Sequence, residues 1–263
     1  MYGYDRTPLD ARVEGPPREA PDWSEERATI TSAYDGSRMS VHLFLPKRVR
    51  PPYQTVIFFP SARVLDLRNS SVLGDTAFFD YVVQSGRAVV YPVYQGTYER
   101  RAQGALPGTA KGMTLTVQRF QDVARTLDYL ATRTDIDTSR TAYLGVSMGA
   151  AEGVIYTTLL QDRLKADIFL DGGFFLWKPA PGSDQADFAP RLHLPALMVN
   201  GRYDFSFSLD RAQRPLFDLL GTPAESKRHV VLDTPHDVRA HRAELISAVL
   251  SWLDRYLGPV AGH

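Results

Sequence analysis

The residues whose types and spacing point most clearly to chemistry lie in the run Gly145-Val-Ser147-Met-Gly149. The serine stands between an apolar run, residues 141–146, and a run typical of a helix. A sharp turn from strand to helix strains the backbone of such a serine, and side chains in place of the two glycines would collide with neighbouring backbone. The motif therefore predicts a nucleophilic serine at the end of a buried strand. The alternative, in which Ser147 only caps the following helix, stays open.

A serine hydroxyl is a weak nucleophile until a neighbouring base takes its proton. Of the six histidines, His236 alone lies between the end of the last predicted strand and the last predicted helix. In an open parallel sheet, ligands bind at the edge where the strands end. The acid that orients the histidine should stand between serine and histidine in the chain, again after a strand. Asp204 meets this condition, and Asp171 is the alternative.

This set of side chains predicts attack on a carbonyl group. His236 would take the proton of Ser147, and Asp204 would hold the imidazole in the required tautomer. The tetrahedral intermediate also needs backbone N–H donors for its negative oxygen.

One such donor is the N–H of Met148, at the start of the helix that follows the serine. The second should come from the loop after the predicted strand 55–59. Pro60 has no N–H, so Ser61 or Ala62 is expected to supply it.

Apolar runs and helical spacing predict the elements that position these residues. Two alternating runs, 28–34 and 39–46, flank Asp35-Gly36-Ser37 and predict an antiparallel hairpin. Continuous apolar runs predict strands buried on both faces, as in a parallel sheet: 55–59, 88–93, 141–146, 166–170 and 196–199, with a last strand at 228–232. Helices are predicted at 76–85, 113–132, 148–161, 208–220 and 240–257. The alternation predicts an α/β fold with a mostly parallel central sheet and helices on both faces.

The chain is expected to divide into an N-terminal extension (1–27), one domain (28–258) and a tail (259–263). Two irregular insertions, about 95–112 and 174–191, interrupt the alternation and are expected to form small lid segments near the site. Aromatic residues in or beside them predict a pocket lined by Tyr94, Tyr98, Phe174, Phe175, Trp177 and Phe205.

Composition limits the other classes of function. The 263 residues include 30 basic and 30 acidic side chains, so the net charge gives no reason to expect nucleic acid or an anionic membrane as partner. No apolar run approaches the roughly 20 residues of a membrane span, and no signal peptide is visible, so we expect a cytoplasmic protein. Without cysteine there is neither a disulfide nor a thiol nucleophile. No metal and no cofactor are predicted, and a homo-oligomer stays open.

Together these residues resemble the α/β-hydrolase superfamily from about residue 28 to 257. More closely, the stretches 51–60, 85–100, 200–205 and 215–223 are similar to dienelactone-hydrolase-like and acetyl-esterase-like members, and to the hydrolase modules attached to some bacterial serine/threonine protein kinases. The resemblance implies the superfamily's nucleophile at Ser147, its acid at Asp204 and its base at His236. Phe59-Pro60 replaces the common His-Gly of the oxyanion loop, and Pro235 replaces a common glycine.

The expected activity is that of a serine carboxylesterase, which cleaves small to medium esters through an acyl-enzyme on Ser147. Dienelactone hydrolases use a cysteine nucleophile, so their own chemistry is not expected in this chain. The alternatives are a peptidase, thioesterase or acyltransferase of the same fold, and a catalytically silent binding module.

Overall fold

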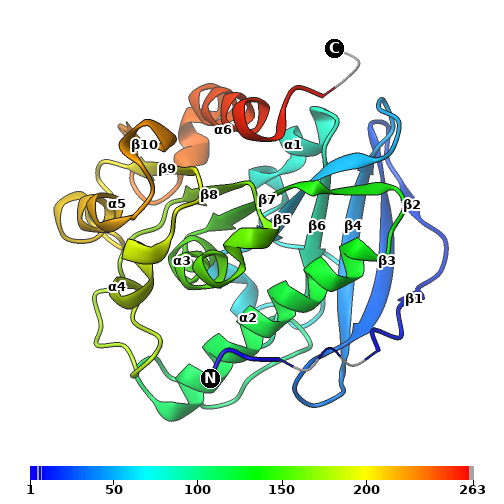
Figure 1. Cartoon of the computed structure of the whole chain (residues 1–263), viewed down its shortest axis with the longest axis horizontal. Helices are drawn as coiled ribbons and strands as arrows, with labels where there is room; N and C mark the ends of the chain where they lie inside the picture. Colours follow the sequence, from blue (N-terminus) through cyan, green and yellow to red (C-terminus); the bar gives the residue numbers. More distant parts are fainter. Residues whose placement is uncertain (5, 7, 261–263) are drawn as a thin grey trace.

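The apolar runs of the chain form one ten-stranded mixed sheet (Figure 1). The computed structural model describes residues 1–4, 6 and 8–260. The strand order is β1-β3-β4-β6-β5-β7-β8-β9-β10, and β2 pairs with β3. The neighbouring strands from β6 to β10 in this order run parallel: β6 Ala88–Pro92, β5 Tyr53–Phe59, β7 Ile136–Val146, β8 Ala166–Leu170, β9 Ala196–Gly201 and β10 Lys227–Leu232. The predicted α/β class with a mostly parallel sheet is confirmed.

The predicted hairpin forms the antiparallel side of this sheet. It consists of β3 Trp23–Thr31 and β4 Arg38–Pro46, and β4 pairs antiparallel with β6. β3 begins five residues before the start predicted from the alternation. Two short strands, β1 Arg12–Val13 and β2 Arg18–Glu19, pair with β3, so much of the segment 1–27 lies along the sheet.

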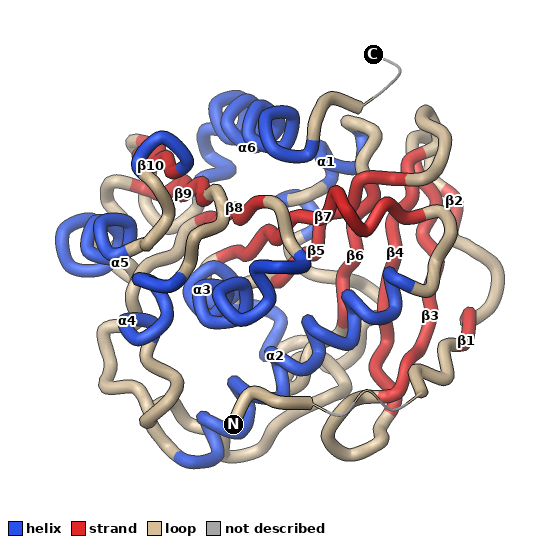
Figure 2. The backbone as a smooth tube through the Cα atoms, in the orientation of Figure 1, coloured by secondary structure: helices blue, strands red, loops and turns tan. Residues whose placement is uncertain are grey.

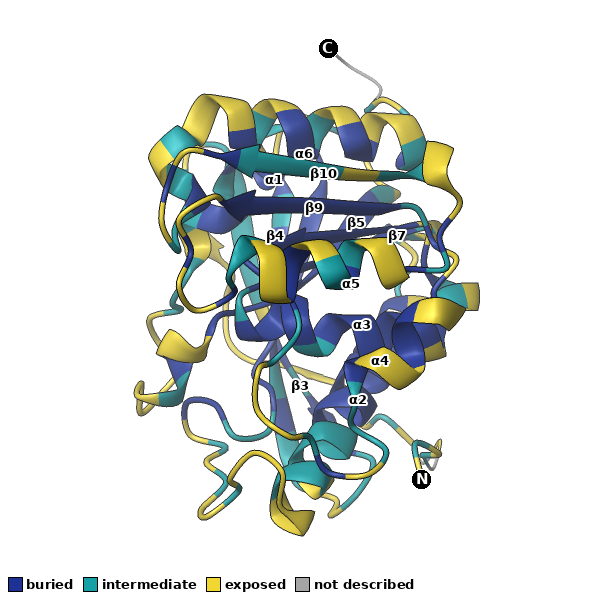
Figure 3. Cartoon of the chain, turned by 90° about the vertical axis from the view of Figure 1, so that its left-hand side faces the viewer, coloured by how far each residue is buried: buried dark blue, intermediate teal, exposed yellow. Residues whose placement is uncertain are grey.

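Helices cover both faces of the sheet, because successive strand residues point to opposite sides. In β5, Val56 and Phe58 pack into the same apolar cluster as α1 Asp80–Gln84 and α6 Arg242–Leu257. Ile57 and Phe59 pack into the cluster of α2 Ala110–Ala131, α3 Met148–Leu160 and α5 Arg214–Leu219. Figure 2 shows the strands between these two layers. Figure 3 shows that the central strands are buried and that β10 is partly exposed at the edge.

Some predicted helix boundaries are wrong. The segment 208–220 contains a π-helical turn, Leu209–Gln213, before α5, because Pro215 lacks an N–H and cannot continue a regular helix. Residues 76–78 form a 3₁₀ turn before α1. α2 begins at Ala110, inside the first insertion, where the hydroxyl oxygen of Thr109 accepts a hydrogen bond from the Gly112 N–H. The second insertion contains the short helix α4 Gln185–Phe188.

The N-terminal residues fold back onto the domain. The ring of Tyr2 packs edge-on against Phe120 and Phe188, and its hydroxyl donates a hydrogen bond to the Gly182 oxygen at 2.9 Å. Among the described helices, none combines the length and apolar character that a bilayer crossing requires. Of the predicted tail 259–263, the last three residues lie outside the described part of the chain.

Candidate active site

Ser147 occupies the sharp turn between β7 and α3 that the motif predicts. Its backbone has φ 53° and ψ −108°, a conformation that side-chain-bearing residues rarely adopt. A Cβ on Gly145 would lie 2.3 Å from the Gly149 oxygen, and one on Gly149 would lie 2.4 Å from the Phe59 oxygen. Both glycines are therefore required by close backbone contacts, and the turn projects Ser147 beyond the end of the sheet.

The side chains of Ser147, His236 and Asp204 form one hydrogen-bonded series. His236 Nδ1 lies 2.7 Å from Asp204 Oδ2, and His236 Nε2 lies 2.9 Å from Ser147 Oγ. An ionised carboxylate only accepts hydrogen bonds, so Nδ1–H donates to Asp204 and Nε2 is left to accept from Ser147. Burial lowers the pKa of His236, but the hydrogen bond and charge of Asp204 outweigh it, and the net pKa is raised. The imidazole is thus held in the tautomer and basicity that proton removal from Ser147 requires.

Asp204 is fixed by its own loop as well as by His236. Its second oxygen, Oδ1, accepts the backbone N–H groups of Ser206 at 2.8 Å and Phe207 at 3.0 Å. The side chain is fully buried, so these bonds replace the water that the carboxylate gives up on folding.

The loops that bear the acid and the base are joined by backbone contacts. The Arg202 N–H donates to the Leu232 oxygen at 2.7 Å, and the Tyr203 N–H donates to the Thr234 oxygen at 3.1 Å. At the end of β9, a Cβ on Gly201 would lie 2.0 Å from the Pro235 oxygen. The loop that carries His236 therefore packs directly on the backbone that leads to Asp204.

The alternative acid, Asp171, lies beside this series but does not orient the histidine. It is 1% exposed, has φ +51°, and its Oδ2 accepts the Val238 N–H at 3.1 Å. Within the described residues, its Oδ1 has no hydrogen-bond partner. Burial raises the pKa of Asp171 to about 7.

Asp171, Asp204 and His236 each place one potential metal-ligating atom within 4.8 Å of the others. His236 Nδ1 and Asp204 Oδ2 are, however, already engaged with each other at 2.7 Å. This arrangement fits proton transfer better than metal binding.

The two alternative loop donors, Ser61 and Ala62, are in different situations. The Ser61 N–H donates to Asp75 Oδ2 at 2.8 Å, so Ser61 as an oxyanion donor is wrong in this structure: its hydrogen is already taken by a carboxylate. The Ala62 N–H, at the start of the 3₁₀ turn Ala62–Leu65, makes no hydrogen bond to any described residue. Ala62 and Met148 line the same cavity as Ser147. The backbone N–H groups of Ala62 and Met148 are therefore the remaining candidate donors to an oxyanion.

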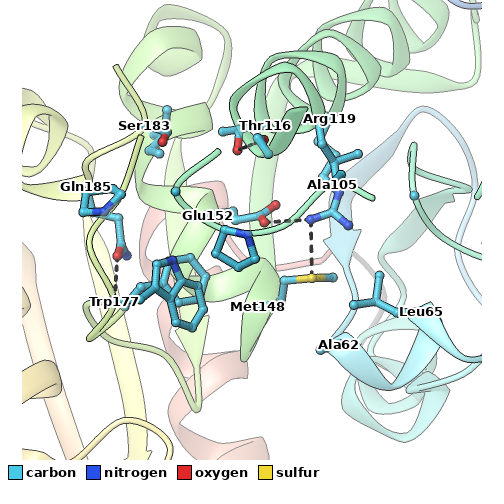
Figure 4. Close-up of a pocket in the computed structure, with 18 of the residues that line it drawn as sticks. Ala62, Leu65, Ala105, Thr116, Arg119, Met148, Glu152, Trp177, Ser183 and Gln185 are labelled. Carbon is cyan, nitrogen blue, oxygen red and sulfur yellow. Dashed lines mark hydrogen bonds and ion pairs between the residues drawn. The ribbon is translucent and has the colours of Figure 1, made fainter. Parts of the chain in front are cut away.

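A cavity of about 720 Å³ opens over the serine. Its walls come from α2, α3 and parts of both insertions (Figure 4). Of the predicted aromatic lining, Phe175 and Trp177 are present, with ring centroids 4.1 Å apart in a stacked pair. Phe207, which follows the acid, also lines the cavity.

The other four predicted lining residues lie elsewhere. Tyr94 is fully buried, stacks on Phe59 and donates to the Phe58 oxygen. Tyr98 is also buried, with its hydroxyl bonded to that of Tyr91. Phe174 packs against the core, and Phe205 is 84% exposed to solvent. Their position in the sequence placed them near the site, but their side chains point into the core or away from the cavity.

One ion pair in the cavity wall was not predicted from the sequence. Arg119 on α2 and Glu152 on α3 meet at 2.7 Å, and both line the cavity. The two residues are far apart in the chain, and the local signal is that Glu152 is the single charged residue of the apolar helix α3.

No family model matches the chain, and no curated protein matches it in sequence. Solved structures do match. A cold-adapted esterase from an Arctic intertidal metagenomic library is 18% identical, with a TM-score of 0.71 over 93% of this chain and 99% of that chain. An acetyl xylan esterase from Paenibacillus sp. R4 is also 18% identical, with a TM-score of 0.71 over 95% and 90%. A dienelactone hydrolase described as putative, from Klebsiella pneumoniae, is 17% identical, with a TM-score of 0.65 over 88% and 98%. The chain therefore has the α/β-hydrolase fold.

Proposed function

We propose that this protein is a serine carboxylester hydrolase. The observation that carries the proposal is the unbroken series of hydrogen bonds from Asp204 through His236 to Ser147 at the floor of a cavity. This series supplies what nucleophilic attack on an ester needs: a hydroxyl, a base within 2.9 Å of it, and a carboxylate that orients the base.

In the proposed reaction, His236 Nε2 takes the proton of Ser147 as Oγ attacks the carbonyl carbon of the ester. The N–H groups of Met148 and Ala62 bind the negative oxygen of the tetrahedral intermediate. His236 then gives its proton to the departing alcohol, and an acyl group remains on Ser147. Water, activated by His236, attacks this acyl-enzyme and releases the acid.

The cavity supports small to medium esters as substrates. Its volume of about 720 Å³ lies within the range of small-molecule sites, and much of its wall is apolar. Several solved structures of the same fold are described as esterases, which favours this activity. A structure described as a putative dipeptidyl aminopeptidase IV also matches, but only 43% of that chain is covered, so a peptidase is less favoured. A catalytically silent module would not need the three side chains in this arrangement. The narrower resemblance to kinase-attached modules and the cytoplasmic location stay predictions, and a homo-oligomer stays open.

The test is hydrolysis of p-nitrophenyl acetate and butyrate by the purified chain. Ser147→Ala should lower kcat by about 10⁴-fold or more, as removal of a nucleophile from such a triad does. Ser183→Ala is the matched control, because Ser183 lines the same cavity and its hydroxyl only bonds the Ala180 oxygen. An acyl-coenzyme A and an aminoacyl nitroanilide, assayed in parallel, separate the alternative activities. A Ser147→Ala variant that kept most of its esterase activity would show that the nucleophile lies elsewhere.

A further inference from the structure

A buried ion pair forms part of the cavity wall beside the nucleophile. Arg119 is 3% exposed, and its Nη1 donates to Glu152 Oε1 at 2.7 Å and lies 3.4 Å from Met148 Sδ. Met148 directly follows Ser147, and Glu152 lies on the same helix. Figure 4 shows the arginine and the glutamate pointing toward each other across the cavity wall, next to the methionine sulfur.

The hydrogen bonds of this pair leave one nitrogen unused. Arg119 Nε donates to the Gln95 oxygen at 2.9 Å, and Nη1 is taken by Glu152. In the described part of the chain, Nη2 has no hydrogen-bond partner, and it lies beside Gly96, which also lines the cavity. Glu152 Oε2 accepts the Tyr156 hydroxyl at 2.8 Å and, like Oε1, retains an unused lone pair. The wall thus presents unused donors next to a carboxylate.

Stability alone does not account for this pair. The cavity wall around it includes Leu115 and Ile155, and apolar residues in place of a buried ion pair are often neutral or stabilising. A charged pair at this position is best explained by a polar group of the substrate. A carboxylate group of the substrate would be repelled by the carboxylate of Glu152. A hydroxyl group is neutral, accepts from Arg119 Nη2 and donates to the glutamate, so it matches both partners.

We propose that Arg119 and Glu152 form a subsite for a substrate hydroxyl group, so that the enzyme prefers esters with a free hydroxyl near the scissile bond. The inference rests on the proposed esterase function and names its substrate class. The hydroxyl could belong to the acyl part or to the alcohol part of the ester, and the experiment separates these two sources.

The experiment compares two matched substrate pairs. One pair is p-nitrophenyl butyrate and 3-hydroxybutyrate, which differ in the acyl part. The other is propyl butyrate and glycerol monobutyrate, which differ in the alcohol part. The wild-type protein should prefer the hydroxylated member of one pair by about tenfold or more in kcat/KM, as expected for a hydrogen bond to a charged group.

The variant Arg119→Met with Glu152→Gln removes both charges and keeps an acceptor for Tyr156. It should lose that preference, so that the ratio of kcat/KM between the two members of the pair falls to about one, whatever the rate on the plain ester. Leu115→Ala is the matched control: Leu115 lies one turn before Arg119 and also lines the cavity, so both members of a pair should change alike. Thermal melting of each variant checks the fold.

An active wild-type protein with no preference in either pair would overturn the subsite while leaving the esterase function intact, and this comparison needs no variant. A preference that persists in the double variant would also overturn the subsite. So would a preference for p-nitrophenyl hemisuccinate over p-nitrophenyl butyrate that disappears in the double variant, because the pair would then bind a carboxylate and not a hydroxyl group. Absence of all hydrolysis, with no difference between wild type and Ser147→Ala, would instead refute the proposed function.

Discussion

Replacing Asp171 with asparagine should change how stability depends on pH. In the folded protein burial raises the pKa of Asp171 to about 7, against 3.8 for the free side chain. Between these values the folded state holds a proton that the unfolded state has lost, so the free energy of unfolding falls as pH rises. The whole difference between the two pKa values corresponds to a loss of about 4 kcal/mol in the free energy of unfolding, of which about 3 kcal/mol is lost between pH 5 and pH 8.

The asparagine variant should not show this loss, because its amide stays neutral. Asparagine also tolerates the positive φ at this position, and its amide oxygen can still accept the Val238 N–H. The difference in free energy of unfolding between Asp171→Asn and wild type should therefore be about 3 kcal/mol more favourable to the variant at pH 8 than at pH 5. Burial also raises the pKa of Asp167, but that residue is present in both proteins and cancels in the difference.

Urea unfolding followed by tryptophan fluorescence at the two pH values measures the effect. Asp162→Asn, at an exposed position, is the control and should change stability equally at both pH values. If Asp171→Asn shifts stability by the same amount at pH 5 and pH 8, the carboxyl group does not hold a proton near neutrality and the reasoning is wrong.

Three further substitutions test the candidate site. Ala62→Pro removes one proposed oxyanion donor and should lower kcat about 10²- to 10³-fold. Proline is tolerated there because Ala62 is the first residue of a 3₁₀ turn and the preceding Ser61 is extended, and the control Ala62→Gly should keep most activity. Gly149→Ala would place a Cβ 2.4 Å from the Phe59 oxygen and should lower the free energy of unfolding by roughly 1–3 kcal/mol or more in urea titrations; unchanged stability would contradict the close contact. Asp204→Asn removes the charge that raises the pKa of His236, so kcat should fall about 10⁴-fold and the acid limb of the kcat/KM profile should move to lower pH; an unmoved limb would mean that Asp204 does not set this pKa.

The fold was predictable because its signals are local. A strand buried on both faces reads as a continuous apolar run, and a strand-to-helix turn around a serine needs glycines at two fixed positions. Ser147 was therefore placed by its immediate neighbours. His236 was placed by its position after the last strand, a rule about strand ends that also holds locally.

The choice between Asp204 and Asp171 was harder, because both follow neighbouring parallel strands. The same rule about strand ends applies to each, and only the paths of the loops after β8 and β9 decide which carboxylate meets the imidazole. Tyr94 and Tyr98 were misplaced for a related reason. Irregular segments have no periodicity from which the direction of a side chain can be read.

Side chains that meet across two helices leave almost no trace in one sequence. Arg119 and Glu152 are separated by the whole of β7, and their pairing depends on how α2 packs against α3. A donor such as the Ala62 N–H is hidden in a different way. Whether a backbone hydrogen is free depends on a distant residue, in this case Asp75, which occupies the N–H of Ser61.

The backbone bonds between the segments after β9 and β10 also limit how the protein can be redesigned. Asp204 and His236 stand on the loops after β9 and β10. These two loops share backbone hydrogen bonds and are in contact at Gly201, where a methyl group would not fit. Lengthening or exchanging one of these loops alone would shift the other and separate Asp204 from His236. Chimeras with related proteins should therefore exchange both loops together, whereas the turn that holds Ser147 can be left in place.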